Sequence, residues 1–237
     1  MDRALVVLDL IASEASPVSL DELASRVGLH RSIVYRLVRS LENAGFVSRD
    51  PVQGGYTYGP ALFSIGVKIT SRFDIRGLFR PVMEEIVQRF GETASLHVRS
   101  GDQRVCVDVV EGVHAIRRVV PVGETLPIYA GETGRALLSM LPDAEVCAYI
   151  DAAAKAGTDA KALQRDIATI RKHGHIVGIG MRTPDVGTLS IPLRGPGALA
   201  AALTISGPAS RWNVAVMEAA ITEVLRIIEP AQRSLRG

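Results

Sequence analysis

Polar and cationic side chains recur along one face of a helix that the sequence predicts between residues 31 and 44. At about 100° per residue, that face carries Ser32, Tyr35, Arg36, Arg39 and Asn43, with Arg31 at its flank. A helix fits the major groove of DNA, and a guanidinium presents a rigid fork of donors to guanine edges or to phosphates. The pattern therefore predicts a DNA-contacting helix, against the alternative of an arginine-rich face that is only solvated.

The remaining reactive side chains match no catalytic motif. The serines lack a nucleophile elbow, and no glycine-rich phosphate loop opens a helix after a strand. A metal site stays an alternative in one stretch of predicted strands, although the spacing fits no recognised site, for His97, Cys106, Asp108 and His114. We therefore expect no enzyme activity, no metal and no cofactor.

The composition is that of a compact protein with room for two domains. Of the 237 residues, 47% are hydrophobic and 22% are charged. No apolar run approaches the roughly 20 residues of a membrane span and no signal segment opens the chain, so we expect a cytoplasmic protein. Cys106 and Cys147 are expected to be reduced and buried. The net charge is +2, and residues 1–59 hold six Arg against seven Asp and Glu, a balance of −1, so attraction to phosphate must be local.

The first 59 residues predict a winged helix-turn-helix. A helix over 3–13 is followed by Ser19 and Glu22, which form a capping box, and a second helix that Gly28 ends. The helix over 31–44 comes third, and strands over 46–49 and 56–58 flank turn residues. Arg49 and Gln53 on this wing are candidates for contact with the DNA backbone. Pro60 then opens a linker helix over 60–74.

Residues 75–237 alternate between helical and strand patterns and predict an α+β sensor domain with an antiparallel sheet. Helices are predicted over 75–90, 134–141, 144–154, 162–173 and 213–233. Strands are predicted over 94–99, 105–111, 116–120, 176–181, 188–193 and 199–206.

This order of elements resembles the isocitrate lyase regulator (IclR) family of transcription factors along nearly the whole chain. The N-terminal residues that carry the resemblance are Arg3-Ala-Leu, Leu20-Asp-Glu-Leu-Ala24, Gly28-Leu29, Tyr35-Arg36-Leu37 and Leu41-Glu-Asn-Ala-Gly45-Phe-Val47. The later ones are Tyr58-Gly59-Pro60, Tyr129-Ala-Gly-Glu-Thr-Gly134-Arg135-Ala136, Ser190-Ile-Pro192-Leu and Leu203-Thr-Ile-Ser206-Gly207-Pro208. Arg135 replaces the usual Lys, Glu132 stands where the family usually has a small residue, and 181–187 follow the family only loosely.

The resemblance implies a GAF-like effector-binding domain, a homodimer or dimer of dimers, and an operator with dyad symmetry. Mapped onto this chain, the family's ligand contacts fall on or near Ala115, Arg118, Glu132, Thr133, Val186, Thr188, Thr204 and Ser206. The charges of Arg118 and Glu132 favour a small polar or zwitterion-like effector, such as an aromatic acid, its amide or its hydrazide. Two alternatives stay open: Arg117 points inward instead of Arg118, and Glu132 lies at the surface of its helix.

The sequence thus predicts a ligand-responsive DNA-binding regulator, and the family resemblance implies that it controls a catabolic operon. The rival from another class is a small-molecule-binding enzyme or signalling module whose N-terminal domain contacts only proteins. The outward arginines separate the two, because they suit DNA and offer a protein partner little apolar anchor.

Overall fold

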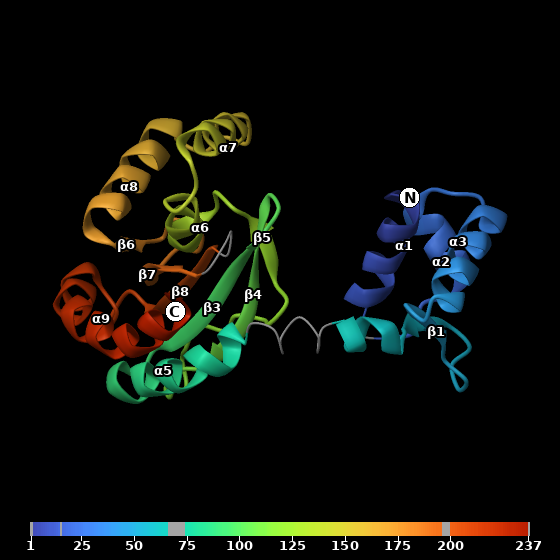
Figure 1. The fold of residues 1–237 in the computed structure, drawn as a ribbon, viewed down its shortest axis with the longest axis horizontal. Helices are drawn as coiled ribbons and strands as arrows, with labels where there is room; N and C mark the ends of the chain where they lie inside the picture. The colour runs from blue at the N-terminus through green and yellow to red at the C-terminus, as the bar shows by residue number, and fades with distance from the viewer. Residues whose placement is uncertain (1, 15, 66–73, 196–199, 237) are drawn as a thin grey trace. The chain divides into compact units, whose positions relative to one another are not determined.

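The computed structural model describes residues 2–14, 16–65, 74–195 and 200–236, and the chain divides into two compact units, Met1–Asp74 and Ile75–Gly237 (Figure 1). The N-terminal unit contains α1 (Asp2–Ser13), α2 (Leu20–Val27), α3 (Arg31–Asn43), β1 (Val47–Arg49) and β2 (Tyr56–Tyr58). The C-terminal unit contains α5 (Ile75–Phe90), β3 (Thr93–Ser100), β4 (Gln103–Val110), β5 (Thr125–Pro127), α6 (Gly131–Leu138), α7 (Asp143–Lys155), α8 (Ala160–His173), β6 (Ile176–Ile179), β7 (Val186–Arg194), β8 (Ala200–Pro208) and α9 (Val214–Arg236).

The N-terminal unit is a three-helix arrangement followed by an antiparallel hairpin. Ser19 begins α2 by accepting a hydrogen bond from the backbone N–H of Glu22 at 3.2 Å. The Glu22 carboxylate accepts from Arg26, so only half of the expected capping box forms. Gly28, with φ +67°, ends α2 in the left-handed conformation that glycine adopts without strain. The buried core of the unit consists of Val7, Ile11, Val18, Leu23, Val34, Val38, Leu41, Val47 and Tyr56.

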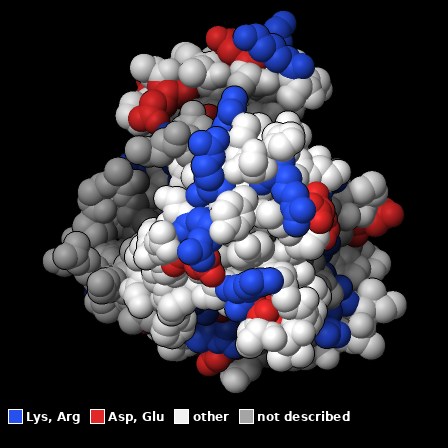
Figure 2. Space-filling view, turned by 90° about the vertical axis from the view of Figure 1, so that its right-hand side faces the viewer, with Lys and Arg blue, Asp and Glu red and all other residues white. Residues whose placement is uncertain are grey.

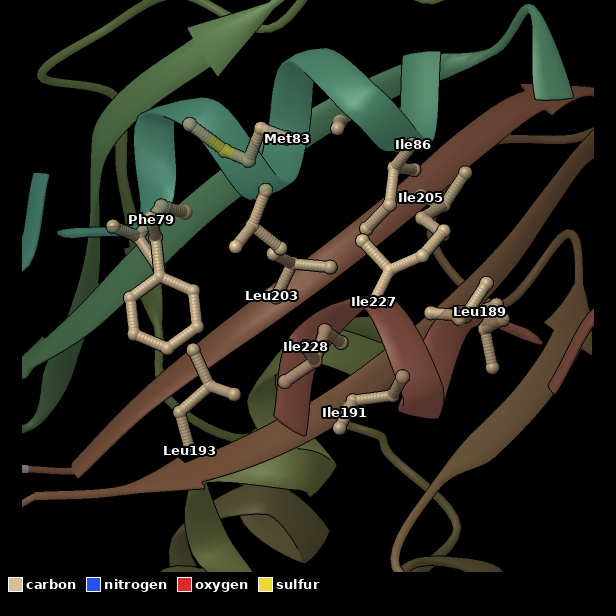
Figure 3. Close-up of a cluster of buried hydrophobic side chains, with 14 of the residues drawn as sticks. Phe79, Met83, Ile86, Leu189, Ile191, Leu193, Leu203, Ile205, Ile227 and Ile228 are labelled. Atoms are coloured by element: carbon tan, nitrogen blue, oxygen red, sulfur yellow. The ribbon is translucent and has the colours of Figure 1, made fainter. Parts of the chain in front are cut away.

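The C-terminal unit is built on a six-stranded sheet in the order β5-β4-β3-β8-β7-β6, in which every neighbouring pair is antiparallel. Side chains alternate between its two faces along each strand. One face is apolar and is covered by α5 and α9. Figure 3 shows side chains from these helices meeting those of β7 and β8, with Phe79, Met83, Ile86, Leu189, Ile191, Leu193, Leu203, Ile205, Ile227 and Ile228 labelled.

The opposite face of the sheet carries α6, α7 and α8, which lie together on that side in Figure 1. These helices share a second apolar cluster with Ile128 and with two alanines of β8, Ala200 and Ala202. Towards the other end of β8 the same face becomes polar, yet it stays buried at Ser95, His97, Thr188, Ser190, Thr204 and Ser206. A buried polar surface of this extent needs partners, and it positions the candidate site described below.

One predicted strand is wrong: residues 116–120 form no strand. The edge of β4 is occupied further along the chain by β5, with Gln103 opposite Pro127. Two carbonyls of this segment bond instead to side chains: Arg211 donates to Ile116 O at 2.6 Å, and Thr93 donates to Arg118 O at 2.6 Å. Arg118 therefore lies on an irregular connection between β4 and β5.

The start of α6 also differs from the prediction. The helix begins at Gly131 and not at Gly134, so Glu132 lies in its first turn. Gly134 lies inside the helix, and glycine is needed there because an added Cβ would lie 2.0 Å from the carbonyl oxygen of Ile128. Glycine at this position is therefore required by close packing and does not mark the start of the helix.

Two further expectations concern single features. Cys106 is buried as expected, whereas Cys147 is exposed on α7, so that prediction was wrong. Within the expected linker helix over 60–74, residues 60–65 are helical and 66–73 lie outside the described residues. In the part of the chain that the structure describes, no helix is long and apolar enough to cross a membrane.

Candidate functional site

The face of α3 that carries the predicted DNA contacts is exposed to solvent. Val34, Val38 and Leu41 on its other face are buried in the core of the N-terminal unit. That packing fixes the orientation of the helix and leaves the polar side chains outside, namely Arg31, Ser32, Tyr35, Arg36, Arg39 and Asn43. His30 begins the helix, accepting from the backbone N–H of Ser32 at 3.4 Å.

The arginines on this face differ in their partners. Arg31 pairs with Asp21 at 2.9 Å, and Arg39 pairs with Glu42 at 2.9 Å. Arg36 has no ion pair or side-chain hydrogen bond within the described residues. Pairs as exposed as these contribute little to folding, so the guanidinium groups can exchange their carboxylate partners for phosphates or bases.

The wing adds one more cation to the same surface. Arg49 at the end of β1 joins Arg31, Ser32 and Tyr35 around a shallow depression between α3 and the hairpin. Figure 2 shows Lys and Arg side chains spread over one face of the molecule, with Asp and Glu side chains beside several of them. Gln53 is exposed in the turn of the wing.

The second site is a polar cavity in the C-terminal unit. Its floor is the buried polar face of the sheet, and its walls are the first turn of α6, the connection from β4 to β5 and the connection from β6 to β7. The space open to the centres of water molecules is about 40 Å³. Seven of the eight predicted effector residues line it: Arg118, Glu132, Thr133, Val186, Thr188, Thr204 and Ser206.

The eighth predicted residue, Ala115, is exposed and does not line the cavity. The two alternatives for the charged pair are also resolved by position. Arg118 lines the cavity, whereas Arg117 is exposed and pairs with Glu111 at 2.6 Å. Glu132 is only 4% exposed, so it does not lie at the surface of α6.

Hydrogen bonds run across the floor of the cavity in two groups. The hydroxyl of Thr204 is 2.9 Å from that of Ser190 and 3.0 Å from that of Thr133. Beside them, Arg104 donates from Nη1 to Nδ1 of His97 at 3.0 Å, and Nε2 of His97 lies 3.0 Å from the Ser95 hydroxyl. The site therefore presents preorganised hydroxyls next to a buried cation.

The described residues also place the histidines and acids that the sequence left open as a metal site. His97 and Cys106 face each other across β3 and β4, and the Cys106 thiol donates to the carbonyl of Asp108. His114 lies against Gly91. Within the described ranges, no group of three or more His, Cys, Asp and Glu side chains is arranged to hold a metal ion.

Comparison with known proteins decides the family. Residues 67–231 match the family described as bacterial transcriptional regulator IclR C-terminal, and residues 1–51 match the IclR helix-turn-helix domain. The chain belongs to the IclR family. Its members are helix-turn-helix transcriptional regulators, and this chain combines that N-terminal domain with the C-terminal α/β domain.

Individual relatives agree with this assignment. The transcriptional regulator KipR of Bacillus subtilis is 36% identical over 148 residues, which cover 62% of this chain and 58% of that protein. The regulator BhcR of Paracoccus denitrificans is 29% identical over 239 residues, covering 95% and 84%. The fold matches a putative IclR regulator from Silicibacter at a TM-score of 0.84 and 24% identity, covering 100% of this chain and 96% of the other.

Several residues that line the cavity were absent from the sequence prediction: Ser95, His97, Arg104, Val120, Glu124, Gly131, Met181, Arg182 and Thr183. Two of these residues could have been predicted from the sequence. Ser95 and His97 are polar residues two apart in a strand, which is the same spacing that singled out Thr204 and Ser206. Arg182 comes from a connection whose path the sequence did not define. It pairs with Glu124 at 3.7 Å and so links the two connections beside the cavity.

Burial shapes the charges of this site. It lowers the pKa of His97 to about 3, with help from the positive charges of Arg104 and Arg182, so the imidazole is neutral. It lowers the pKa of Arg104 to about 10 and raises the pKa of Glu132. Because Nδ1 of the neutral His97 accepts from Arg104, Nε2 carries the proton and donates to Ser95.

Proposed function

We propose that this IclR-family chain is a ligand-responsive repressor or activator that binds a palindromic operator and controls a catabolic operon. The observation that carries the proposal is the outer face of α3, where six polar or cationic side chains are exposed while the opposite face packs into the core. A protein partner would find few apolar anchors on this face, whereas DNA offers phosphates and base edges to each guanidinium. The proposed contacts are Arg31, Ser32, Tyr35, Arg36, Arg39, Asn43 and Arg49.

The charge balance of the N-terminal unit supports binding as a homodimer or dimer of dimers. Residues 1–59 hold six Arg against seven Asp and Glu, so one copy attracts DNA weakly at long range. Two copies related by a two-fold axis would present two α3 helices to half-sites about one helical turn apart, or a multiple of it.

The cavity of the C-terminal unit is the proposed effector site. Effector contacts are assigned to Arg118, Glu132, Thr133, Val186, Thr188, Thr204 and Ser206, and no catalytic step is assigned to the chain. The polar lining suits a small acid, and an aromatic acid, amide or hydrazide would need side chains to move because the free space is about 40 Å³. Binding changes DNA affinity only if the effector binds the two states of the protein unequally.

The test uses the intergenic DNA upstream of the gene and the full-length protein. Replacing Arg36 and Arg39 together with Ala should weaken DNA binding by about 1 to 3 kcal/mol for each side chain that contacts a base, and the circular dichroism spectrum should not change. The matched control replaces Arg89 on α5 and Arg233 on α9 together with Ala, which removes the same two charges from pairs with Glu223 and Glu229. If the double variant binds this DNA as tightly as the control variant, α3 is not the recognition helix.

A further inference from the structure

Arg104 is a buried cation whose hydrogen bonds are incomplete. The residue is 4% exposed and lines the cavity from β4. Its Nη1 donates to His97, but its Nε has no hydrogen-bond partner within the part of the chain that the structure describes. A buried N–H of a charged group that lacks an acceptor is costly, so an acceptor from a ligand would lower the free energy of this site.

His97 holds the Arg104 side chain in place. The imidazole accepts from Nη1 of Arg104 on one side and donates to Ser95 on the other, and it is 2% exposed. Because His97 is neutral, it orients the guanidinium without neutralising its charge. The edge that carries Nε is left for an anion, and a carboxylate matches the fork of guanidinium donors.

Glu132 is the second buried charge with an incomplete set of partners. It is 4% exposed in the first turn of α6, and its Oε1 accepts no hydrogen bond from any described residue. The carboxylate fits against Gly178 of β6, where an added Cβ would lie 2.6 Å from Oε1. Glu132 and Arg104 interact electrostatically but form no ion pair, so a ligand that reached both would satisfy both.

The charges of the cavity indicate which ligand balances them. Three arginines line it, Arg104, Arg118 and Arg182, against two carboxylates, Glu124 and Glu132. With all five ionised, the lining has three positive and two negative charges, so one negative charge on the ligand makes it neutral. The donor that Glu132 requires must then be uncharged, which favours a hydroxyl over an ammonium group. Space of about 40 Å³ suits a molecule of a few heavy atoms.

We propose that the effector is a small aliphatic 2-hydroxy acid whose carboxylate binds Arg104 and whose hydroxyl donates to Glu132. This inference rests on the proposed function of the cavity and assigns the anion to Arg104, which the family mapping does not include. His97 is a positioning residue, since it acts on the ligand only through the guanidinium of Arg104. The hydroxyls of Thr133 and Thr204, which lie 3.0 Å apart and line the cavity, contact the rest of the ligand.

Isothermal titration of the full-length protein with matched three-carbon compounds tests the ligand class. At about pH 8, which favours the ionised form of the Glu132 carboxyl although burial raises its pKa, D- or L-lactate should bind at least about tenfold more tightly than each compound that lacks one feature. Propionate lacks the hydroxyl, pyruvate replaces it with a keto oxygen, alanine replaces it with an ammonium group, and lactamide lacks the negative charge.

Variants assign the two ends of the ligand. Arg104→Gln should weaken lactate binding at least about tenfold, and Arg104→Lys, which keeps the cation, should recover part of it. Glu132→Gln should reduce the preference for lactate over pyruvate towards one, because an amide both donates and accepts. The matched control is Arg117→Gln in the connection from β4 to β5, where the side chain is exposed; this variant should bind lactate like the parent protein.

Each contrary result has a separate meaning. Undiminished lactate binding by a folded Arg104→Gln variant overturns the role of Arg104, and propionate or pyruvate binding as tightly as lactate overturns the role of Glu132. If none of these acids binds, the ligand class is wrong. If DNA binding still depends on Arg36 and Arg39, the proposed function stands although the ligand class is wrong. If DNA binding does not depend on them, both the proposed function and the inference about the ligand are contradicted.

Discussion

His97 lies between Ser95 and Arg104, and its surroundings disfavour a positive charge on the imidazole. Its pKa is lowered from 6.5 to about 3, first by burial and then by Arg104 and Arg182. In the unfolded chain the imidazole takes up a proton as the pH falls below 6.5, whereas the folded chain does not do so until about pH 3. His97 therefore makes the folded state less stable as the pH falls from 6.5 towards 3, and has no such effect above 6.5.

Comparison with His97→Gln measures this effect, because glutamine keeps a donor and an acceptor but does not titrate. Between about pH 7.5 and about pH 5, the parent protein should lose about 2 kcal/mol more of its free energy of unfolding than the variant. Urea unfolding at the two pH values gives the free energy of unfolding of the parent protein and of the variant. Equal losses would mean that His97 can accept a proton in the folded chain.

Glu92 is a second buried charge, and it depends on one arginine. The residue is 1% exposed and pairs with Arg211, which also donates to Ile116 O. Arg211→Ala should lower the free energy of unfolding by about 3 to 5 kcal/mol, since it leaves the carboxylate buried without a counter-charge. The exposed pair of Arg233 with Glu229 provides the control: Arg233→Ala should cost about 1 kcal/mol or less in the same denaturant titration. Similar losses in the two variants would contradict the burial argument.

For single residues, the periodicity of the sequence predicted which face of an element a side chain occupies but not which side chains it contacts. The exposure of the α3 face and the shared face of Thr204 and Ser206 follow from spacing alone. The Arg104–His97 contact does not, because it joins strands whose register includes an irregularity between Leu96 and His97. A shift of one residue at such a point changes which side chains meet.

Among the elements, α2 depends on the side chain that begins it. Ser19 supplies an acceptor for one of the first backbone N–H groups of the helix, and no second bond from Glu22 returns to reinforce it. Ser19→Ala should therefore destabilise the N-terminal unit by about 1 kcal/mol. Ser40→Ala on the exposed side of α3 is the control and should stay within about 0.5 kcal/mol. Thermal unfolding would report both, and equal midpoints for the two variants would show that the cap is dispensable.

The elements with a strong period were predicted closely, and the irregular ones were not. The helix over 75–90 and the strand over 56–58 have the predicted bounds, because their apolar residues recur regularly and turn residues flank them. The segment 116–120 has the composition of a strand but lies where side chains of Arg211 and Thr93 satisfy its carbonyls. Such tertiary bonds leave no mark on a local pattern.

For the whole molecule, the chain divides into two compact units, and each has an apolar core of its own. The division at residue 74 coincides with the change from short helices and a hairpin to the long helix over 75–90. How copies assemble leaves no such mark, since a symmetric interface can form on many surfaces.

Assembly on DNA leads to a prediction about spacing. If two α3 helices bind half-sites together, inserting about 5 base pairs between the half-sites turns one to the opposite side of the duplex and should weaken binding at least about tenfold. Inserting about 10 base pairs restores the facing and should recover part of the affinity. Electrophoretic mobility shifts with the footprinted operator and its two insertion variants measure this. If the insertion of about 5 base pairs leaves the DNA affinity unchanged, each copy binds its half-site independently.

The fit of Glu132 against Gly178 restricts how relatives of this chain can diverge. In a chain with glutamate at 132, a side chain at 178 requires the Glu132 carboxylate to move, because Oε1 would lie 2.6 Å from the added Cβ. A lineage that replaces Glu132 with a small residue is free to acquire Ala or Ser at 178. The two positions, 46 residues apart in the chain (178 − 132), should therefore substitute together.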